Sequence, residues 1–309
     1  MCIATMDLYR LSVYSPSLVK ESSIEVTINK ELGSLSISSF GFGLTQQALK
    51  YICIENPKLM HFKENSISNL GLYGVHYVCD QFSITTKHMD DKEIVWETDL
   101  RNTPRTYRIK PSSTLNHGIH MLLHFKKDKV DLLDSNQIVI RLKQYHQYNP
   151  YPILINVIPD NQSTRIEQTK PIWSHYPSLE NDYTPFYETI TKSSTSEYLA
   201  HMHYEIEGQL EFTILLFIPK KALFTTKEYL ERPPNVHLYC RRVLDTAECQ
   251  QLIPNYLNFL EGIVDSEDIP ADNSLDSNMK SKMIKVMSKN VIRKLLDLLF
   301  YLFDKGKEK

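Results

Sequence analysis

Long hydrophobic runs are missing from this sequence. The longest apolar segment, Leu295–Phe303, contains Asp297 and is too short to cross a membrane. Asp7 and Arg10 interrupt the apolar residues near the start, so the sequence does not begin like a signal peptide. We therefore expect no membrane partner. Because the cysteines give no sign of a disulfide framework, a reducing compartment, the cytosol or the nucleus, is the simplest setting, and we expect a cytoplasmic protein.

Cysteines are also few, and neither sign of charge dominates. The five cysteines are an odd number and form no Cys-x-x-Cys pair, which argues against a disulfide framework or a zinc knuckle. The formal net charge of −2 gives no reason to expect nucleic acid as a partner. His117, His120 and His124 cannot close on one metal ion, because on a strand they face opposite sides or stand roughly 13 Å apart. His201 and His203 share a strand face but lack a third ligand, so we expect no metal site.

The chain is long enough for two domains. Its 309 residues are 42% hydrophobic and 23% charged, as in globular proteins. Alternating apolar residues in 1–158 predict a largely antiparallel sheet with helices, an α+β domain. The polar segment 159–170 is predicted to be a linker. A second domain, 171–309, should contain helices at Leu252–Val264 and from about Asn278 to Phe303.

The last predicted helix has two surface features. Its cations line one face, which is interpreted as an ordinary solvated face, with nucleic-acid binding as a minor alternative. Its apolar end, Leu295–Phe303, is predicted to form an exposed patch that binds a partner or promotes aggregation. The cations are Lys280, Lys282, Lys285, Lys289, Arg293 and Lys294.

One stretch has the pattern of a ligand-binding turn. Leu35 and Ile37 alternate with serines, as in a half-buried strand. Gly41 and Gly43 then permit a tight turn, and Thr45 can cap the helix that follows. A strand, a Gly-x-Gly turn and a helix start could form the floor of a nucleotide site, although two glycines alone more often mark only a turn.

Several longer segments match the motifs of one known family. They are Thr86–His88, Trp96–Glu97, Lys170–Trp173, Glu207–Phe212, Leu216–Pro219, Tyr239–Val243, Leu252–Phe259 and Val264–Pro270. Together they resemble the heat shock protein 90 chaperones of the eukaryotic cytosolic type. The resemblance covers about Asp7 to Arg293 and is specific, because its motifs are long and occur in order. It implies a two-layer ATP-binding α/β sandwich, shared with gyrase and histidine kinases, and then an α/β middle domain, both truncated.

The resemblance also implies cofactors and partners. Family members use ATP and Mg, and they bind client proteins and co-chaperones. Because the match stops inside the middle domain, the family's homodimerisation domain is expected to be absent here.

The residues that the family uses for ATP are largely replaced. The catalytic glutamate would precede the chain, and Met1 falls where an asparagine holds magnesium. Ser39 replaces the aspartate that bonds adenine, and Ile52 replaces a lid-side asparagine. Leu275 replaces the middle-domain arginine that reaches the γ-phosphate, so no catalytic residue is assigned.

A few positions of the nucleotide site are retained. Gly41 and Gly43 match the family's glycines, and Lys58 matches a lysine close to the phosphates. The glycine-rich lid loop is shortened around Leu72, and Ile119 replaces a threonine near the pocket floor. Nucleotide contacts, if they persist, would involve Ser39, Gly41, Gly43, Lys58 and Leu72.

Three hypotheses follow. The preferred one is a chaperone-like binding protein with a degenerate ATP site that acts without ATP hydrolysis, as a pseudoenzyme. The second is an ATP-dependent chaperone that holds ATP weakly through Gly41, Gly43 and Lys58. The third is a decayed copy without a function.

Overall fold

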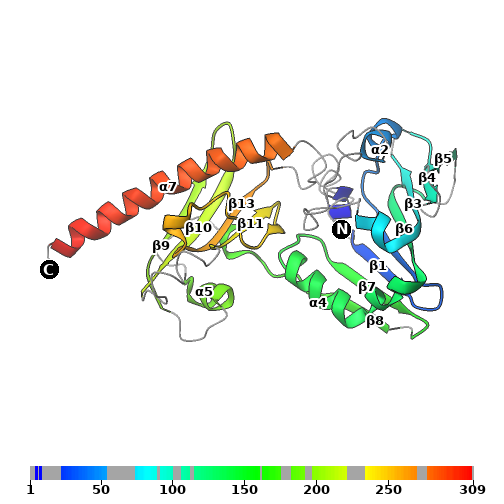
Figure 1. Ribbon diagram of the computed structural model, residues 1–309, viewed down its shortest axis with the longest axis horizontal. Coiled ribbons are helices and arrows are strands. Elements are labelled where there is room, and N and C mark those ends of the chain that lie inside the picture. Colours follow the sequence, from blue (N-terminus) through cyan, green and yellow to red (C-terminus); the bar gives the residue numbers. More distant parts are fainter. Residues whose placement is uncertain are drawn as a thin grey trace. The chain divides into compact units, whose positions relative to one another are not determined.

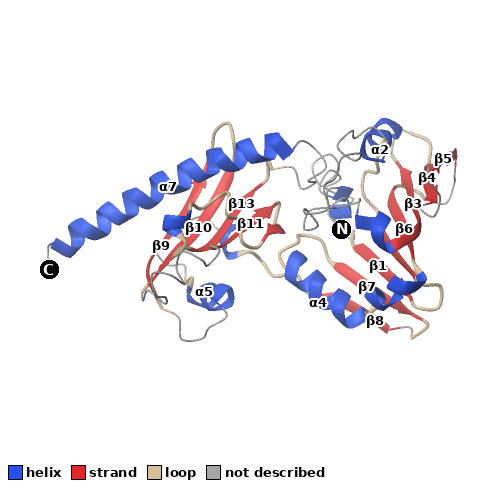
Figure 2. Ribbon diagram, in the orientation of Figure 1, coloured by secondary structure: helices blue, strands red, loops and turns tan. Residues whose placement is uncertain are grey.

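The chain forms two compact units in the computed structural model, Met1–Thr169 and Lys170–Ala271 with Asp276–Lys309. Each unit contains one mixed β-sheet with helices, which confirms the predicted α+β class (Figures 1 and 2). No described helix is long and apolar enough to cross a membrane. The structure describes residues 4–5, 7–8, 22–53, 74–88, 91–99, 106–111, 115–160, 162–174, 182–191, 197–220, 234–269 and 277–307.

The first unit is built on an eight-stranded sheet of order β5-β4-β3-β6-β2-β1-β7-β8. Neighbouring strands are antiparallel except β1 and β7, which run parallel. β1 and β2 form a hairpin around a turn that contains Gly33 at φ +57°. The strands are β1 (Ile24–Asn29), β2 (Ser34–Ser39), β3 (Cys79–Lys87), β4 (Ile94–Asp99), β5 (Thr106–Pro111), β6 (Gly118–Phe125), β7 (Ile153–Ile158) and β8 (Gln162–Ile166).

The helices of this unit contribute apolar side chains to the core beside the sheet. Leu49 of α2 and Leu142 of α4 are buried with Ile24 and Ile153. Asp134 caps α4, because its side chain accepts a hydrogen bond from the Asn136 backbone N–H at 3.1 Å. The helical elements are α2 (Gln46–Cys53), α3 (Val75–Val78), η5 (Lys127–Leu133) and α4 (Ser135–His146).

The interpretation of 159–170 as a linker needs a correction. Residues 162–166 form strand β8, which pairs with β7 at the edge of the first sheet. Gln162 to Arg165 are exposed, and only Ile166 enters the core. An edge strand with one buried side chain has the composition of a linker, so composition alone could not separate the two.

A buried histidine should make the stability of the first unit depend on pH. Burial lowers the pKa of His146, at the end of α4, to about 3. Its Nδ1 has no hydrogen-bond partner among the described residues. Below about pH 6.5 the unfolded imidazole takes up a proton that the folded one does not, so the free energy of unfolding should fall.

We expect a loss of about 1.4 kcal/mol between pH 7.5 and pH 5.5 from His146 alone. Urea unfolding of the wild type and of His146→Phe at both pH values measures it. Burial also lowers the pKa of His120, His201 and His203, so the difference between the two proteins is the relevant quantity. If the free energy of unfolding changed equally with pH in the wild type and in His146→Phe, the prediction would be wrong.

The second unit has a five-stranded sheet of order β12-β11-β13-β10-β9. Its neighbours are antiparallel except β11 and β13, which run parallel. The strands are β9 (Tyr198–Ile206), β10 (Phe212–Pro219), β11 (Asn235–Cys240), β12 (Val243–Thr246) and β13 (Glu261–Ser266); the helical elements are η6 (Ile172–Ser174), α5 (Thr184–Thr191), η7 (Asn255–Leu257) and α7 (Ser277–Lys307).

The two faces of this sheet are packed differently. Aliphatic side chains such as Leu216 and Leu238 share one core cluster with Met287 and Leu295 of α7. Aromatic rings gather around Phe217 of β10, whose ring lies 5.0 Å from that of Tyr187 of α5. Alternate side chains of β10 therefore enter the aliphatic cluster and the aromatic cluster, so both faces of the strand are buried.

The predicted helix at Leu252–Val264 is wrong. Only the short 3-10 helix η7 forms there, and β13 follows it in the centre of the sheet. The residue before a proline avoids the α-helical region, so Pro254 disfavours a helix that begins at Leu252 and runs through Ile253. β13 is buried along its whole length but has the sequence Glu-Gly-Ile-Val-Asp-Ser, so it shows neither the alternation of a half-buried strand nor a long apolar run.

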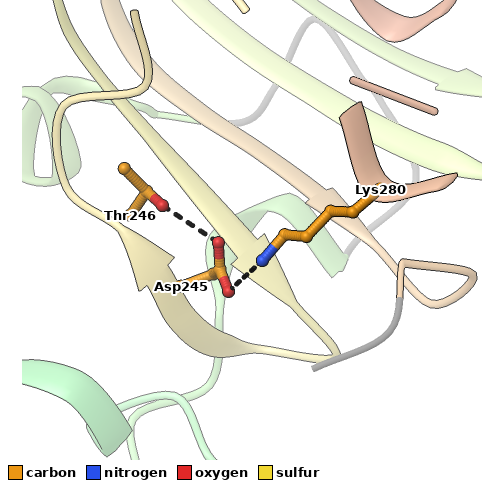
Figure 3. Close-up of polar contacts among 3 residues, drawn as sticks. All are labelled: Asp245, Thr246 and Lys280. Atoms are coloured by element: carbon orange, nitrogen blue, oxygen red, sulfur yellow. Dashed lines mark hydrogen bonds and ion pairs between the residues drawn. The ribbon is translucent and has the colours of Figure 1, made fainter. Parts of the chain in front are cut away.

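The long C-terminal helix α7 is confirmed and is attached to the sheet by a buried ion pair. Lys280 Nζ lies 2.6 Å from Asp245 Oδ1 on β12, and the two side chains are only 10% and 8% exposed. The hydroxyl of Thr246 donates to the other carboxylate oxygen of Asp245 at 2.9 Å (Figure 3). The first turns of α7 are thus fixed by charge as well as by apolar packing.

Candidate functional site: the Gly41–Gly43 turn

The predicted ligand-binding turn connects the end of β2 to the start of α2. Ser39 is the last residue of β2, and α2 begins at Gln46. The predicted cap is confirmed, because the Thr45 hydroxyl accepts a hydrogen bond from the Ala48 backbone N–H at 3.2 Å. The strand, the turn and the helix start therefore lie where the sequence placed them.

A carboxylate from a distant part of the chain occupies the inside of this turn. Asp7 is 3% exposed, and its Oδ1 accepts a hydrogen bond from the Gly43 N–H at 2.6 Å. Its Oδ2 accepts one from the Gly41 N–H at 3.0 Å and another from the Ser39 hydroxyl at 2.8 Å. Three donors of the turn thus converge on one buried acidic side chain.

Both glycines are required by close packing. A Cβ at Gly41 would collide with the carboxylate of Asp7, and a Cβ at Gly43 would collide with the carbonyl oxygen of Lys87. Gly43 also has φ +79°, which disfavours residues with a Cβ. The Gly-x-Gly pattern therefore follows from contacts within the protein.

Side chains from β3 and the start of β6 hold the outer side of the turn. The buried Thr86 Oγ1 accepts from the Leu44 N–H at 2.7 Å and donates to the Leu44 carbonyl at 3.2 Å. His117 Nδ1 lies 3.0 Å from the Gly41 carbonyl oxygen, the geometry of a hydrogen bond in which the ring nitrogen donates. The Phe42 ring packs edge-on against His88 with centroids 4.8 Å apart.

The described residues predicted to bind nucleotide are mostly enclosed. Ser39 is 1% exposed, and Gly41 and Gly43 are buried. Ile119 is 1% exposed, belongs to the core and faces Ser39 in the β2–β6 ladder. Met1, Lys58, Leu72 and Leu275 lie outside the described residues, as does the side chain of Ile52.

The histidines considered as metal ligands have other partners. His120 Nδ1 is 2.8 Å from the Ser38 hydroxyl. His203 Nδ1 is 2.7 Å from the Tyr183 hydroxyl, and its Nε2 is 3.2 Å from the Trp173 carbonyl oxygen. Within the described part of the chain, no group of three or more His, Cys, Asp or Glu side chains is placed to hold a metal ion.

Asp7 is the residue that the sequence reasoning missed. It lies 32 to 36 positions before its three partners, so no local motif connects it to them. An isolated aspartate near a chain start resembles any solvated charge. The only available signal was the pair of closely spaced glycines, whose amide groups need an acceptor once they are buried.

Comparisons with known proteins find similarity to the Hsp90 proteins. The family model described as Hsp90 protein matches residues 158–308. The chain is 28% identical to an endoplasmin homolog of Caenorhabditis elegans, over 94% of this chain and 45% of the relative. It is also 28% identical to a putative human heat shock protein HSP 90-beta-3, over 87% of this chain and 47% of that relative. The chaperone protein HtpG of Sulfurovum is also 28% identical, over 88% of this chain and 48% of that relative. The chain therefore spans about half the length of these relatives.

Proposed function

Because the chain is related to the Hsp90 proteins over most of its length, we propose that it binds unfolded proteins as a chaperone without hydrolysing ATP. Proteins described as chaperones are among its relatives, which supports this class of function. Its partners would be client proteins and co-chaperones.

The hydrogen bonding of the Gly41–Gly43 turn is the observation that carries this proposal. The amide groups of both glycines donate to Asp7, as does the hydroxyl of Ser39, so these donors already have an anionic acceptor inside the protein. A phosphate or a base would have to compete with a buried carboxylate for them. Replacement of the family's aspartate by Ser39 removes a charge-assisted bond, worth about 1.5–3 kcal/mol or ten- to a hundredfold in affinity.

Two measurements on the purified chain test the proposal. We expect it to suppress the light scattering of a heat-denatured model protein at a few-to-one molar ratio, equally with and without magnesium-ATP. We also expect magnesium-ATP to leave its thermal melt unchanged. A ligand at a hundred times its dissociation constant would add about 2.7 kcal/mol, a shift of several degrees.

Each result has a distinct meaning. A rise in the melting temperature with ATP would favour the ATP-dependent chaperone and contradict the account of Ser39. Failure to suppress scattering by a chain that melts cooperatively would reject the chaperone proposal. The absence of a cooperative transition would favour the decayed copy. Serum albumin at the same concentration is the control for nonspecific suppression of scattering.

A further inference from the structure

The solvent-facing side of α7 carries a continuous row of exposed cations and large apolar side chains. Its members recur every three or four positions and are all exposed, so they lie along one side of the helix. The row spans about 27 Å at the rise of an α-helix. We call it the α7 stripe; it consists of Lys282, Lys285, Lys289, Arg293, Leu296 and Phe300.

The opposite side of α7 is fixed to the sheet. Ile284, Met287, Val291 and Leu295 are at most 5% exposed in the core of the second unit. The predicted patch at Leu295–Phe303 is therefore divided, because Leu295 is fully buried while Leu296 and Phe300 are 47% and 66% exposed. Figure 1 shows α7 crossing the five-stranded sheet and continuing beyond it. The stripe is thus presented by a helix whose orientation is set by its buried side.

The charge along the stripe is of one sign. No Asp or Glu occurs in the helix from Ser277 to Leu296, although the whole chain has a net charge of −2. Lys280 and Lys294 are engaged elsewhere, with Asp245 and with the ring of Tyr204. Among the described residues, Lys282, Lys285 and Lys289 form no ion pair. The stripe therefore carries its cations from Lys282 to Arg293 and its exposed apolar side chains at Leu296 and Phe300.

We propose that the α7 stripe binds an acidic amphipathic protein segment. Carboxylates of the partner would face Lys282, Lys285, Lys289 and Arg293, and its apolar side chains would cover Leu296 and Phe300. A nucleic-acid backbone would complement the cations only, because it offers phosphates where the stripe offers apolar surface. The stripe belongs to the second unit and the Gly41–Gly43 turn to the first, and the proposal stands whether or not the chain binds unfolded proteins.

Fluorescence anisotropy with two labelled peptides of about 20 residues tests the proposal. The first peptide is helical, with Glu along one part of a face and Leu along the rest; the second has Lys in place of every Glu. We expect the whole chain to bind the first and not the second. Raising the salt from 50 to 300 mM should weaken binding severalfold, because exposed charges are then screened.

Variants separate the two parts of the stripe. Lys282→Glu/Lys289→Glu and, independently, Phe300→Ser should each weaken binding of the acidic peptide at least tenfold. Because these side chains are exposed, their circular dichroism and melting temperature should match the wild type. The matched control is Lys127→Glu/Lys143→Glu, which makes the same charge change at exposed lysines of the first unit and should leave binding unchanged.

Several outcomes would overturn the proposal. If the control Lys127→Glu/Lys143→Glu weakened binding of the acidic peptide as much as the stripe variants do, the net charge of the chain alone would explain the attraction. Undiminished binding by Phe300→Ser would remove the apolar anchor. Displacement of the peptide by a single-stranded oligonucleotide or by phosphatidylserine vesicles at equal charge would assign the cations to those ligands. Self-association that the stripe variants abolish would make a second copy of this chain the occupant.

Discussion

The Asp7→Asn variant is expected to lose roughly 3–5 kcal/mol of stability in the first unit. The carboxylate satisfies two backbone N–H groups and one hydroxyl, all buried. An asparagine of the same shape has one oxygen and one NH₂ group, so one of the two glycine N–H groups must face another donor. Each buried donor without a partner costs about 1–3 kcal/mol, and the charge-assisted bonds are lost as well.

The two tryptophans of the chain make this effect measurable unit by unit. Trp96 lies in the first unit and Trp173 in the second. In a Trp173→Phe background, urea unfolding followed by fluorescence reports on the first unit alone. Ser39→Ala should cost less than Asp7→Asn, because it removes one of the three bonds, and the exposed Glu31→Gln should change little. An Asp7→Asn midpoint within error of Glu31→Gln would show that the turn does not depend on the carboxylate.

The Lys280→Met variant should destabilise the second unit by about 3–5 kcal/mol. It removes the Lys280 ammonium from the buried Asp245 carboxylate, which keeps the hydrogen bond from the Thr246 hydroxyl (Figure 3). A buried charge that loses its partner keeps its desolvation cost without the compensating attraction. Asp245→Leu should also destabilise the unit, because it removes the carboxylate that the Lys280 ammonium contacts at 2.6 Å.

The double variant Asp245→Leu/Lys280→Met should recover most of the loss, because it removes both buried charges. Its free energy of unfolding should equal that of the wild type or exceed it by about 1–4 kcal/mol. Trp173 reports on this unit in a Trp96→Phe background, and Trp96 is suited to replacement because its Nε1 has no hydrogen-bond partner among the described residues. The exposed Lys282→Met is the matched control. Additive single effects would show that the two side chains do not interact energetically.

Local patterns were sufficient for much of the fold. Alternating Ile24, Val26 and Ile28 predicted β1, because a strand with one buried face repeats every two residues. The apolar spacing from Ile284 to Leu302 predicted α7, because a helix buries one side every three or four residues. Thr45 predicted the start of α2 through its capping hydroxyl.

Segments whose burial depends on the rest of the chain were not predictable in this way. β13 is buried on both faces between β10 and β11, so its sequence has no alternation to reveal a strand. β8 buries only Ile166, so its sequence resembles a linker. In both cases the position of the strand in the sheet, and not its own composition, decides its structure.

The candidate site also has one part that the sequence predicts and one part that it does not. The sequence by itself determined that a tight turn with two glycines follows β2, because few residues besides glycine accept such a backbone. Only the tertiary structure decided what that turn holds, because Asp7 reaches it from more than 30 positions away. The pairing of Lys280 with Asp245, 35 positions apart, was decided in the same way. A hydrogen bond or an ion pair between distant residues leaves no periodic trace in a sequence, since it depends on how separate elements pack.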